Sequence, residues 1–462
     1  EIYPLSLHDA LPISFTTRPR SVLVACWILV VLALAACHPP PPAPDASLAQ
    51  TPEAPFAYPW EDPVVATVVG TPPDLRAPLP ETIPTSLNRL QVLPERQIPE
   101  IFWFQRGMRY TLSPQPGEAP LVMIIPGTGA GPTARLVDVL SRIFYAGGYH
   151  VLAVPSPTFS NFAVTASSTG VPGRVDRDAR DLHQALRLAY DEVQSRIRIK
   201  NDDVSLVGYS LGGWHGAFVG WLDENEAERP LGFRRVLMIN PPVNLYTSSR
   251  ILDDYIDKIP GGISGLPAFF NEVFRSLSSL YTSSAGPSDL TGDFLYQSYV
   301  ALQPPREVLA ALIGVAFRLA STDLTFTADV MGDVGTLVRP ERRFAISDSL
   351  TPFLVAGLRH GFTDYLQNLL YPFYTRTEPM LTIDKLIAEA DLRRLGGYLA
   401  SNPKYRLITN ADEIINSKAE LDFLRGTFGD RAKIFPRGGH CGNFQYPHVV
   451  AAMLQALAED AP

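Results

Sequence analysis

Cysteine is scarce in this sequence. Three cysteines occur in 462 residues, and they are Cys26, Cys37 and Cys441. The first two lie in or at the edge of an apolar N-terminal segment, far along the chain from the third. Zinc sites of the structural type need clustered Cys and His ligands, and the sequence has no such cluster, so we expect no metal centre of that kind.

Long runs of basic residues are also lacking. Lys and Arg total 39 against 47 Asp and Glu, which gives a formal net charge of -8 at neutral pH. Because binding to nucleic acid needs clustered positive charge, we do not expect nucleic acid as a partner. Hydrophobic residues make up 46% of the chain and charged residues 19%, which is typical of a folded globular protein and argues against disorder.

No methionine precedes Met108, and the chain begins with Glu1. A secreted protein should begin with Met a few residues ahead of its signal segment. We therefore interpret residues 1–14 (EIYPLSLHDALPIS) as translated sequencing-adapter sequence joined to a gene without its true start. A genuine but truncated N-terminus is the alternative. In either case residues 1–14 are excluded from the fold prediction.

Residues 15–36 have the pattern of a signal peptide. Arg18 and Arg20 precede the apolar stretch Val22–Ala36, which is shorter than the roughly 20 residues that a membrane-spanning helix needs. The stretch ends in Leu34-Ala35-Ala36-Cys37, which resembles the lipobox of bacterial lipoproteins, where signal cleavage leaves a lipidated cysteine as the new N-terminus. An uncleaved anchor or an ordinary signal peptide is the alternative.

The lipobox resemblance implies that acyl chains on Cys37 hold the protein on a membrane face. The next residue is His38 rather than Asp, which implies the outer membrane of the bacterial cell envelope, on its periplasmic side. Lipidation of Cys37 would leave Cys441 without a partner for an intrachain disulfide. Residues 37–60 are rich in Pro and Ala, so we expect them to form a semi-rigid tether.

Residues 61–462 are expected to form one α/β domain. Short apolar runs alternate with amphipathic helical patterns, which predicts a mostly parallel central sheet with helices on both faces. Two early segments, Pro63–Val69 and Glu100–Thr111, are also strand candidates. The clearer strands are predicted at Leu121–Ile125, His150–Val154, Val204–Val207, Arg235–Ile239, Tyr405–Thr409 and Ala432–Pro436, and the helices at Leu136–Tyr145, Arg174–Arg198 and Pro447–Ala458.

The alternation stops at about residue 243 and returns at about residue 404. The block between is mostly helical by its pattern of apolar residues, so we expect a large helical insertion over the carboxyl ends of the strands, where it would act as a lid. Candidate helices are Ala268–Tyr281, Arg306–Ala320, Pro352–Tyr371 and Ile383–Ala400.

A candidate nucleophile follows the predicted strand Val204–Val207. The residues Gly208-Tyr209-Ser210-Leu211-Gly212 match G-x-S-x-G and are followed by a helical pattern. Gly208 and Gly212 provide the space that a tight strand-to-helix turn needs. This context resembles the nucleophile elbow of the α/β-hydrolase superfamily. A glycine-rich turn without chemistry is the alternative.

The resemblance implies the chain order Ser, then Asp or Glu, then His for a catalytic triad. We expect His440, in a glycine-rich loop after the final strand, to be the base. His448, at the start of the closing helix, is the alternative. His215 lies only five residues beyond Ser210, so we expect it to serve packing or the rim of the site.

The acid is predicted just past the strand Tyr405–Thr409, as the superfamily resemblance implies. Asp412 is the first choice and the adjacent Glu413 is its rival, whereas Asp422 lies too far into the next helix. An ordinary helix N-cap is the alternative for Asp412.

The same resemblance implies an oxyanion hole made of two backbone N–H groups. We expect them from Leu211 and from Thr128, in the loop Pro126-Gly127-Thr128-Gly129. Pro126 stands where many relatives have His, which leaves the Thr128 donor unaffected. Gly127 and Gly129 keep the backbone open to substrate. A phosphate-binding loop is the rival, but no G-x-x-x-x-G-K-[ST] pattern follows.

The resemblance therefore implies a serine hydrolase that works through an acyl-enzyme intermediate and needs no cofactor or metal. The apolar and aromatic residues of the insertion favour a carboxylic ester, either a small molecule or a lipid, as substrate. A peptidase or amidase and an acyltransferase are the alternatives among enzymes. From another class, a non-catalytic binding module of the cell envelope remains possible on the same fold.

Overall fold

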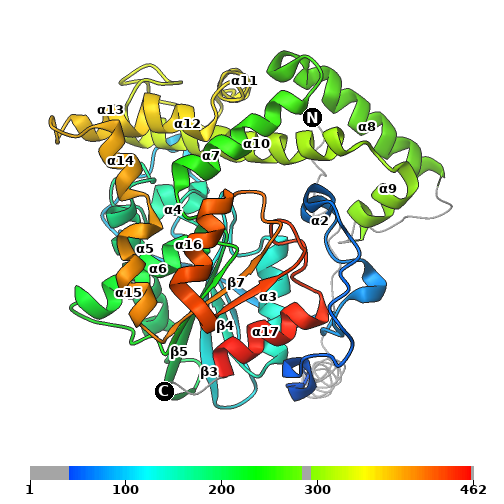
Figure 1. Cartoon of the computed structure of the whole chain (residues 1–462). Helices are drawn as coiled ribbons and strands as arrows, with labels where there is room; N and C mark the ends of the chain where they lie inside the picture. The colour runs from blue at the N-terminus through cyan, green and yellow to red at the C-terminus, as the bar shows by residue number, and fades with distance from the viewer. Residues whose placement is uncertain (1–40, 284–292, 459–462) are drawn as a thin grey trace, which may run out of the picture. The chain divides into compact units, whose positions relative to one another are not determined.

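A computed structural model describes residues 41–283 and 293–458 (Figure 1). The chain divides into two units, Glu1–Pro42 and Ala43–Pro462, and the fold belongs to the second. The predicted signal segment and the Leu34–Cys37 motif lie outside the described residues.

An eight-stranded sheet forms the centre of the fold, in the order β1-β2-β4-β3-β5-β6-β7-β8. β1 and β2 are antiparallel to their neighbours, and every pair from β4 to β8 is parallel. The predicted α/β class with a mostly parallel sheet is confirmed. The strands are β1 Ser86–Leu90, β2 Met108–Ser113, β3 Ala119–Ile125, β4 His150–Ala153, β5 Ile199–Tyr209, β6 Arg235–Ile239, β7 Tyr405–Asn410 and β8 Ala432–Phe435.

Helices cover both faces of the sheet (Figure 1). They are α3 Arg135–Ala146, α4 Ser160–Thr165, α5 Val175–Val193, α6 Leu211–Asn225, α16 Lys418–Phe428 and α17 Pro447–Ala458. Alternate residues of β3 enter two separate cores, because successive side chains of a strand point to opposite faces. Leu121 and Met123 pack with α5 and α6, whereas Val122 and Ile124 pack with α3 and α17.

The block between β6 and β7 is helical. Its helices are α7 Leu245–Asp254, α8 Leu266–Ser283, α9 Phe294–Leu302, α10 Arg306–Gly332, α11 Thr351–Gly357, α12 Phe362–Tyr365, α13 Tyr371–Thr375, α14 Ile383–Glu389 and α15 Gly396–Ser401. A π-helix, Leu366–Leu370, joins α12 to α13. Figure 1 shows α7, α10 and α12 close together beyond one end of the sheet.

α10 is the longest helix in the described part of the chain. It is also the one helix there that is long and apolar enough to cross a membrane. However, 56% of its most apolar window is buried inside the protein. We therefore interpret α10 as the core helix of the insertion, around which α7, α11 and α12 pack.

One predicted strand is wrong, and a second is correct only at its end. Pro63–Val69 is a helix, α2, which begins with Asp62 accepting a hydrogen bond from Val64 N at 2.8 Å and ends at Gly70 with φ of 76°. Its β-branched residues suggest a strand, but the Asp cap and the first-turn proline favour a helix start. In the segment Glu100–Thr111 only the end is extended, from Met108 onward, and Glu100–Phe102 is a 3-10 turn.

The predicted tether, residues 37–60, is in large part packed on the body. Leu48 and Tyr58 are buried in the core beside α3 and α17. Tyr58 donates a hydrogen bond to Gly442 O at 2.9 Å, and His448 Nε2 lies 2.8 Å from Ala54 O. From about Asp45, whose N–H donates to Ala146 O, the segment therefore belongs to the fold. Its aromatic side chains interrupt the Pro and Ala pattern and explain the packing.

Candidate active site

Ser210 lies at a strained turn between β5 and α6. Its φ of 54° and ψ of -129° fall where side chains are rarely found. The turn is possible because its neighbours lack side chains. A Cβ on Gly208 would lie 2.1 Å from Gly212 O, and one on Gly212 would lie 2.0 Å from Ile125 O. These contacts confirm the predicted strand–turn–helix geometry around Ser210.

His440 contacts Ser210 directly. Its Nε2 lies 2.9 Å from Ser210 Oγ, and its Nδ1 lies 2.9 Å from Glu413 Oε1. The structure thus brings together two of the three predicted residues and adds the rival carboxylate. A hydroxyl, an imidazole and a carboxylate in this order can pass a proton from the hydroxyl to the ring while the carboxylate stabilises the charged ring.

Asp412, the predicted acid, does not contact His440. It accepts hydrogen bonds from Gly438 N at 3.1 Å and Gly439 N at 3.0 Å, in the loop that carries His440. The turn after β7 aims the two adjacent side chains at different targets, so Glu413 reaches the imidazole and Asp412 reaches the loop backbone. Burial raises the pKa of Asp412, and the two amides oppose that shift.

The side chain of Glu413 is fixed on both oxygens. Oε1 also accepts from Ile414 N at 2.8 Å, and Asn240 Nδ2 donates to Oε2 at 2.5 Å. The side chain is fully buried. Both oxygens of Glu413 therefore act as hydrogen-bond acceptors, which fixes the orientation of the carboxyl group beside His440.

The pKa of His440 is raised well above its usual value of 6.5. Burial lowers this pKa, whereas the Glu413 carboxylate 2.9 Å from Nδ1 raises it. Burial also raises the pKa of the Cys441 thiol, which therefore stays uncharged at neutral pH. Glu413 is then the charge that stabilises the protonated imidazole.

The loop that carries His440 is held by α2, which sequence reasoning missed. His440 N donates to Thr67 Oγ1 at 2.9 Å, and Asn410 Nδ2 donates to Gly439 O at 2.8 Å. A Cβ on Gly439 would lie 2.2 Å from Pro63 O, so the loop fits closely against the helix. Nothing in the local sequence of Thr67 indicates this role, because the contact joins residues 373 positions apart.

Two backbone amides beside Ser210 make no hydrogen bond to any described residue. They are those of Leu211, the first residue of α6, and of Thr128, in the loop after β3. Gly127 lets this loop approach, since a Cβ there would lie 3.1 Å from Ser210 Cβ. Gly129 N donates to Thr158 Oγ1 at 2.8 Å, which holds the loop in place. Both amides are suited to receive a negatively charged oxygen near Ser210.

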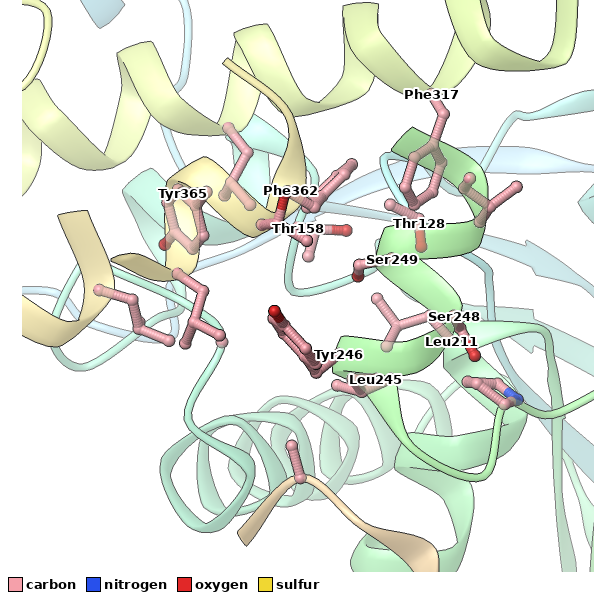
Figure 2. A pocket seen from close by; sticks show the side chains of 18 of the residues that line it. Thr128, Thr158, Leu211, Leu245, Tyr246, Ser248, Ser249, Phe317, Phe362 and Tyr365 are labelled. Atoms are coloured by element: carbon pink, nitrogen blue, oxygen red, sulfur yellow. The ribbon is translucent and has the colours of Figure 1, made fainter. Parts of the chain in front are cut away.

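A cavity of about 110 Å³ opens next to Ser210. Thr128 and Leu211 line it on the side of the sheet, and Figure 2 shows both beside residues of the insertion. The insertion contributes mostly apolar and aromatic side chains, including Tyr246, Leu252, Phe317, Leu324, Phe362, Tyr365 and Leu370. His440 does not line this cavity.

The remaining candidate residues take other positions. His448, the rival base, contacts Ala54 O and packs on Phe56 and Tyr446. His215, expected to serve packing or the rim, is buried and lines the cavity together with Asp178. Within residues 41–283 and 293–458 there is no group of three or more His, Cys, Asp and Glu that could hold a metal ion.

A parallel sheet covered on both faces, with a serine at a strand-to-helix elbow, defines the α/β-hydrolase fold. Comparison with protein-family models agrees, since the model described as "Alpha/beta hydrolase family" matches residues 121–453. The chain therefore belongs to the alpha/beta hydrolase family, and the family and fold together support a hydrolase.

Two solved structures are similar to this chain at low sequence identity. Esterase B from Lactobacillus rhamnosis (HN001) is 12% identical, with a TM-score of 0.38, and the match covers 82% of this chain and 86% of that one. A hydrolase from Pseudomonas aeruginosa PA01 is 14% identical, with a TM-score of 0.37, and the match covers 81% and 99%. No curated protein matches the sequence. At these TM-scores the two structures say nothing about the reaction of this chain.

Proposed function

We propose that this protein is a serine hydrolase that cleaves carboxylic esters. Ser210 is the nucleophile, His440 is the general base, and Glu413 is the carboxylate that orients the imidazole and stabilises its protonated form. The observation that carries the proposal is the continuous contact from Ser210 Oγ through both ring nitrogens of His440 to Glu413 Oε1, with 2.9 Å at each step. Glu413 replaces Asp412 as the third member of the predicted triad.

The proposed reaction has two halves. Ser210 Oγ attacks the ester carbonyl while His440 Nε2 takes its proton, and the oxyanion forms beside the Leu211 and Thr128 amides. His440 then donates the proton to the leaving alcohol, which departs and leaves an acyl group on Ser210. Water then attacks the acyl-enzyme while His440 takes its proton, and His440 returns that proton to Ser210 Oγ as the bond to the acyl group breaks and the acid is released.

The positions of His440 and the cavity support an assignment of the substrate's two parts. The leaving alcohol must lie near His440 to receive its proton. Because Ser210, Leu211 and Thr128 line the cavity but His440 does not, the acyl group fits the cavity and the alcohol lies outside it. The apolar lining favours a hydrocarbon acyl chain, and the insertion acts as its lid. An amide or a non-water acceptor would use the same atoms, so ester cleavage is the first reaction to test.

Hydrolysis of p-nitrophenyl esters over a range of acyl lengths tests the proposal, with the full chain in detergent and Ser210→Ala as its matched control. We expect turnover that is lost in Ser210→Ala, with both proteins equally folded by circular dichroism. If the two proteins hydrolyse every ester equally, Ser210 is not the nucleophile. If a folded protein hydrolyses none, amide substrates become the better candidates, followed by a non-catalytic binding module.

The membrane anchor is a second part of the proposal, and it is supported by sequence alone. Leu34-Ala35-Ala36-Cys37 resembles a lipobox, so Cys37 would carry the lipid and place the hydrolase at the outer membrane, on the periplasmic side. Expression in a Gram-negative host followed by membrane fractionation tests this. We expect Cys37→Ser to move the protein to the soluble fraction, and a variant that still sediments with membranes would refute the lipid anchor.

A further inference from the structure

A second cavity, of about 70 Å³, lies beside His440. Its wall is formed by α2 and the residues that follow it, by the first turns of α3, and by the loop that carries His440. Thr67 belongs to the α2 side of the wall and Arg135 to the α3 side. No described residue lines both this cavity and the one beside Ser210. We call the two spaces the His440 cavity and the Ser210 cavity.

The contact between Ser210 and His440 links one residue of each cavity. Ser210 Oγ lines up with His440 Nε2 at 2.9 Å, and each residue belongs to the wall of its own cavity. The side chain of His440 is 17% exposed, so part of the ring is open to its surroundings. In the proposed reaction the acyl group occupies the Ser210 cavity, and the alcohol receives its proton from His440. The His440 cavity is therefore the space available to the leaving alcohol.

Arg135 is the one arginine or lysine among the described residues that line the His440 cavity, and no described Asp or Glu lines it. The Arg135 side chain is exposed and makes no hydrogen bond or ion pair to a described residue. The other two arginines whose charges act on it are both paired. Arg76 lies 2.5 Å from Asp293, and Arg142 lies 3.0 Å from Asp138. Three guanidinium groups thus share two carboxylates, and Arg135 is the one left over.

The surroundings of Arg135 hold excess positive charge. Partial removal from water lowers the pKa of Arg135, as do Arg76 and Arg142, whereas Asp293 raises it. The guanidinium nevertheless stays charged at neutral pH. Arg135 is also the first residue of α3, whose N-cap Ala134 makes no side-chain cap bond, so the amino end of the helix adds to the same potential. This local excess is opposite in sign to the net charge of -8 of the whole chain.

An anionic group fits this place. A carboxylate or a phosphate can accept two parallel N–H bonds from a guanidinium, which gives Arg135 the partner that it lacks. We infer that the alcohol part of the substrate carries a carboxylate or a phosphate, which Arg135 binds while His440 protonates the leaving oxygen. This inference rests on the proposed function, and it extends that function from the acyl group to the alcohol.

Arg135 would determine specificity for the alcohol. Hydrogen bonds to charged groups are among the strong ones, but the exposure of Arg135 weakens its pairing with an anion. We therefore expect the anionic alcohol to raise kcat/KM about 10-fold over a neutral alcohol of the same shape. Because salt screens exposed charges, the preference should shrink between about 10 mM and about 1 M NaCl.

The test compares phenyl esters of one acyl group that carry a carboxylate, a phosphate or a neutral carboxamide at the meta or para position of the ring. The measured quantity is the ratio of kcat/KM for each anionic ester to that for the carboxamide, in the full-length protein and in Arg135→Gln. Comparison between the two proteins cancels the intrinsic reactivity of each ester. We expect the ratio to fall about 10-fold in Arg135→Gln and to be partly retained in Arg135→Lys. The ester that loses more shows whether the site prefers carboxylate or phosphate.

Arg142→Gln is the matched control, because it removes another arginine of α3 that does not line the His440 cavity. We expect it to leave the ratio unchanged, with all variants folded by thermal unfolding. Equal ratios in the native protein and Arg135→Gln at both ring positions would overturn the inference. An equal loss in Arg142→Gln would also overturn it, because the effect would then come from the general charge of the region and not from contact with Arg135.

A binding measurement separates this inference from the proposed function. Ser210→Ala should bind the carboxylate or the phosphate ester more tightly than the carboxamide ester, as measured by calorimetry at low salt. The difference should disappear in Ser210→Ala/Arg135→Gln. This result would support the anion site even if Ser210-dependent turnover were absent. Equal affinities for the three esters, together with equal kcat/KM ratios, would refute the anion site even if Ser210 hydrolysed all of them.

Discussion

Replacing each of the two adjacent carboxylates, Glu413 and Asp412, by its amide tests which of them is the third member of the triad. In Glu413→Gln the new amide keeps the size of the side chain and removes its charge. The amide oxygen can stay at the Oε1 position, where the donors Ile414 N and His440 Nδ1 both favour an acceptor. Its NH2 group then faces Asn240 Nδ2, which lies 2.5 Å from Oε2 in the native protein, so Asn240 must rotate its own amide to relieve the contact between donors.

The cost to catalysis should therefore come mainly from the lost charge. A hydrogen bond to a charged group contributes about 1.5–3 kcal/mol, and the charge of Glu413 matters most when His440 is protonated in the transition state. We expect kcat to fall about 100-fold, with a smaller change in KM. Asp412→Asn keeps one oxygen for the amides of Gly438 and Gly439, so we expect a loss of less than about 10-fold.

The assay is steady-state hydrolysis of the best p-nitrophenyl ester by the full-length protein and the two variants, with thermal unfolding as a check on folding. Glu413→Gln should be the more damaging change to kcat by at least about tenfold. An Asp412→Asn variant that stays folded and loses as much activity as Glu413→Gln, or more, would refute the assignment of Glu413.

Three further predictions follow from the same contacts. Activity should fall at acid pH with a midpoint above 6.5, because the pKa of His440 is raised and the neutral imidazole is the base. Glu413→Gln removes a charge that raises this pKa, so it should move the midpoint to lower pH. A pH profile that Glu413→Gln leaves unchanged would contradict this charge effect. Thr67→Val removes the acceptor for His440 N–H and should lower kcat roughly fivefold, with KM and the melting temperature little changed; full activity would show that the loop does not need α2. Gly212→Ala would place a Cβ 2.0 Å from Ile125 O and should destabilise the fold by about 3 kcal/mol or more in denaturant unfolding, and native stability would refute the close approach.

The parallel core of the fold could be predicted because its signals are local. β3 to β8 are short apolar runs separated by helical patterns, and the predicted bounds agree to within two residues except for β5, which begins five residues before its predicted start. The early segment at Pro63–Val69 was not, because its β-branched composition and its helix cap indicate opposite structures. The segment forms the helix that its cap indicates. Thr67 and Pro63 of this helix then pack against the His440 loop.

The nucleophile and the base of the site could be predicted, because a motif and the order of residues along the chain indicate them. Ser210 has a motif with a required context, and His440 is one of only two histidines after the predicted acid. Asp412 and Glu413 are adjacent carboxylates, and the sequence does not show which one meets His440, because the contacts that fix them, to Asn240 and to the His440 loop, are with residues distant in sequence. His215, expected at the packing or the rim of the site, is buried in α6 and is one of the residues that line the cavity.

Mapping the residue that reacts with a fluorophosphonate probe tests the central claim most directly, because the reagent labels only a serine that a neighbouring base has activated. Peptide mass spectrometry of the labelled full-length protein should place the adduct on Ser210, with labelling lost in Ser210→Ala and slowed in Glu413→Gln. A folded protein that carries no adduct, or carries it on another serine, would contradict the account.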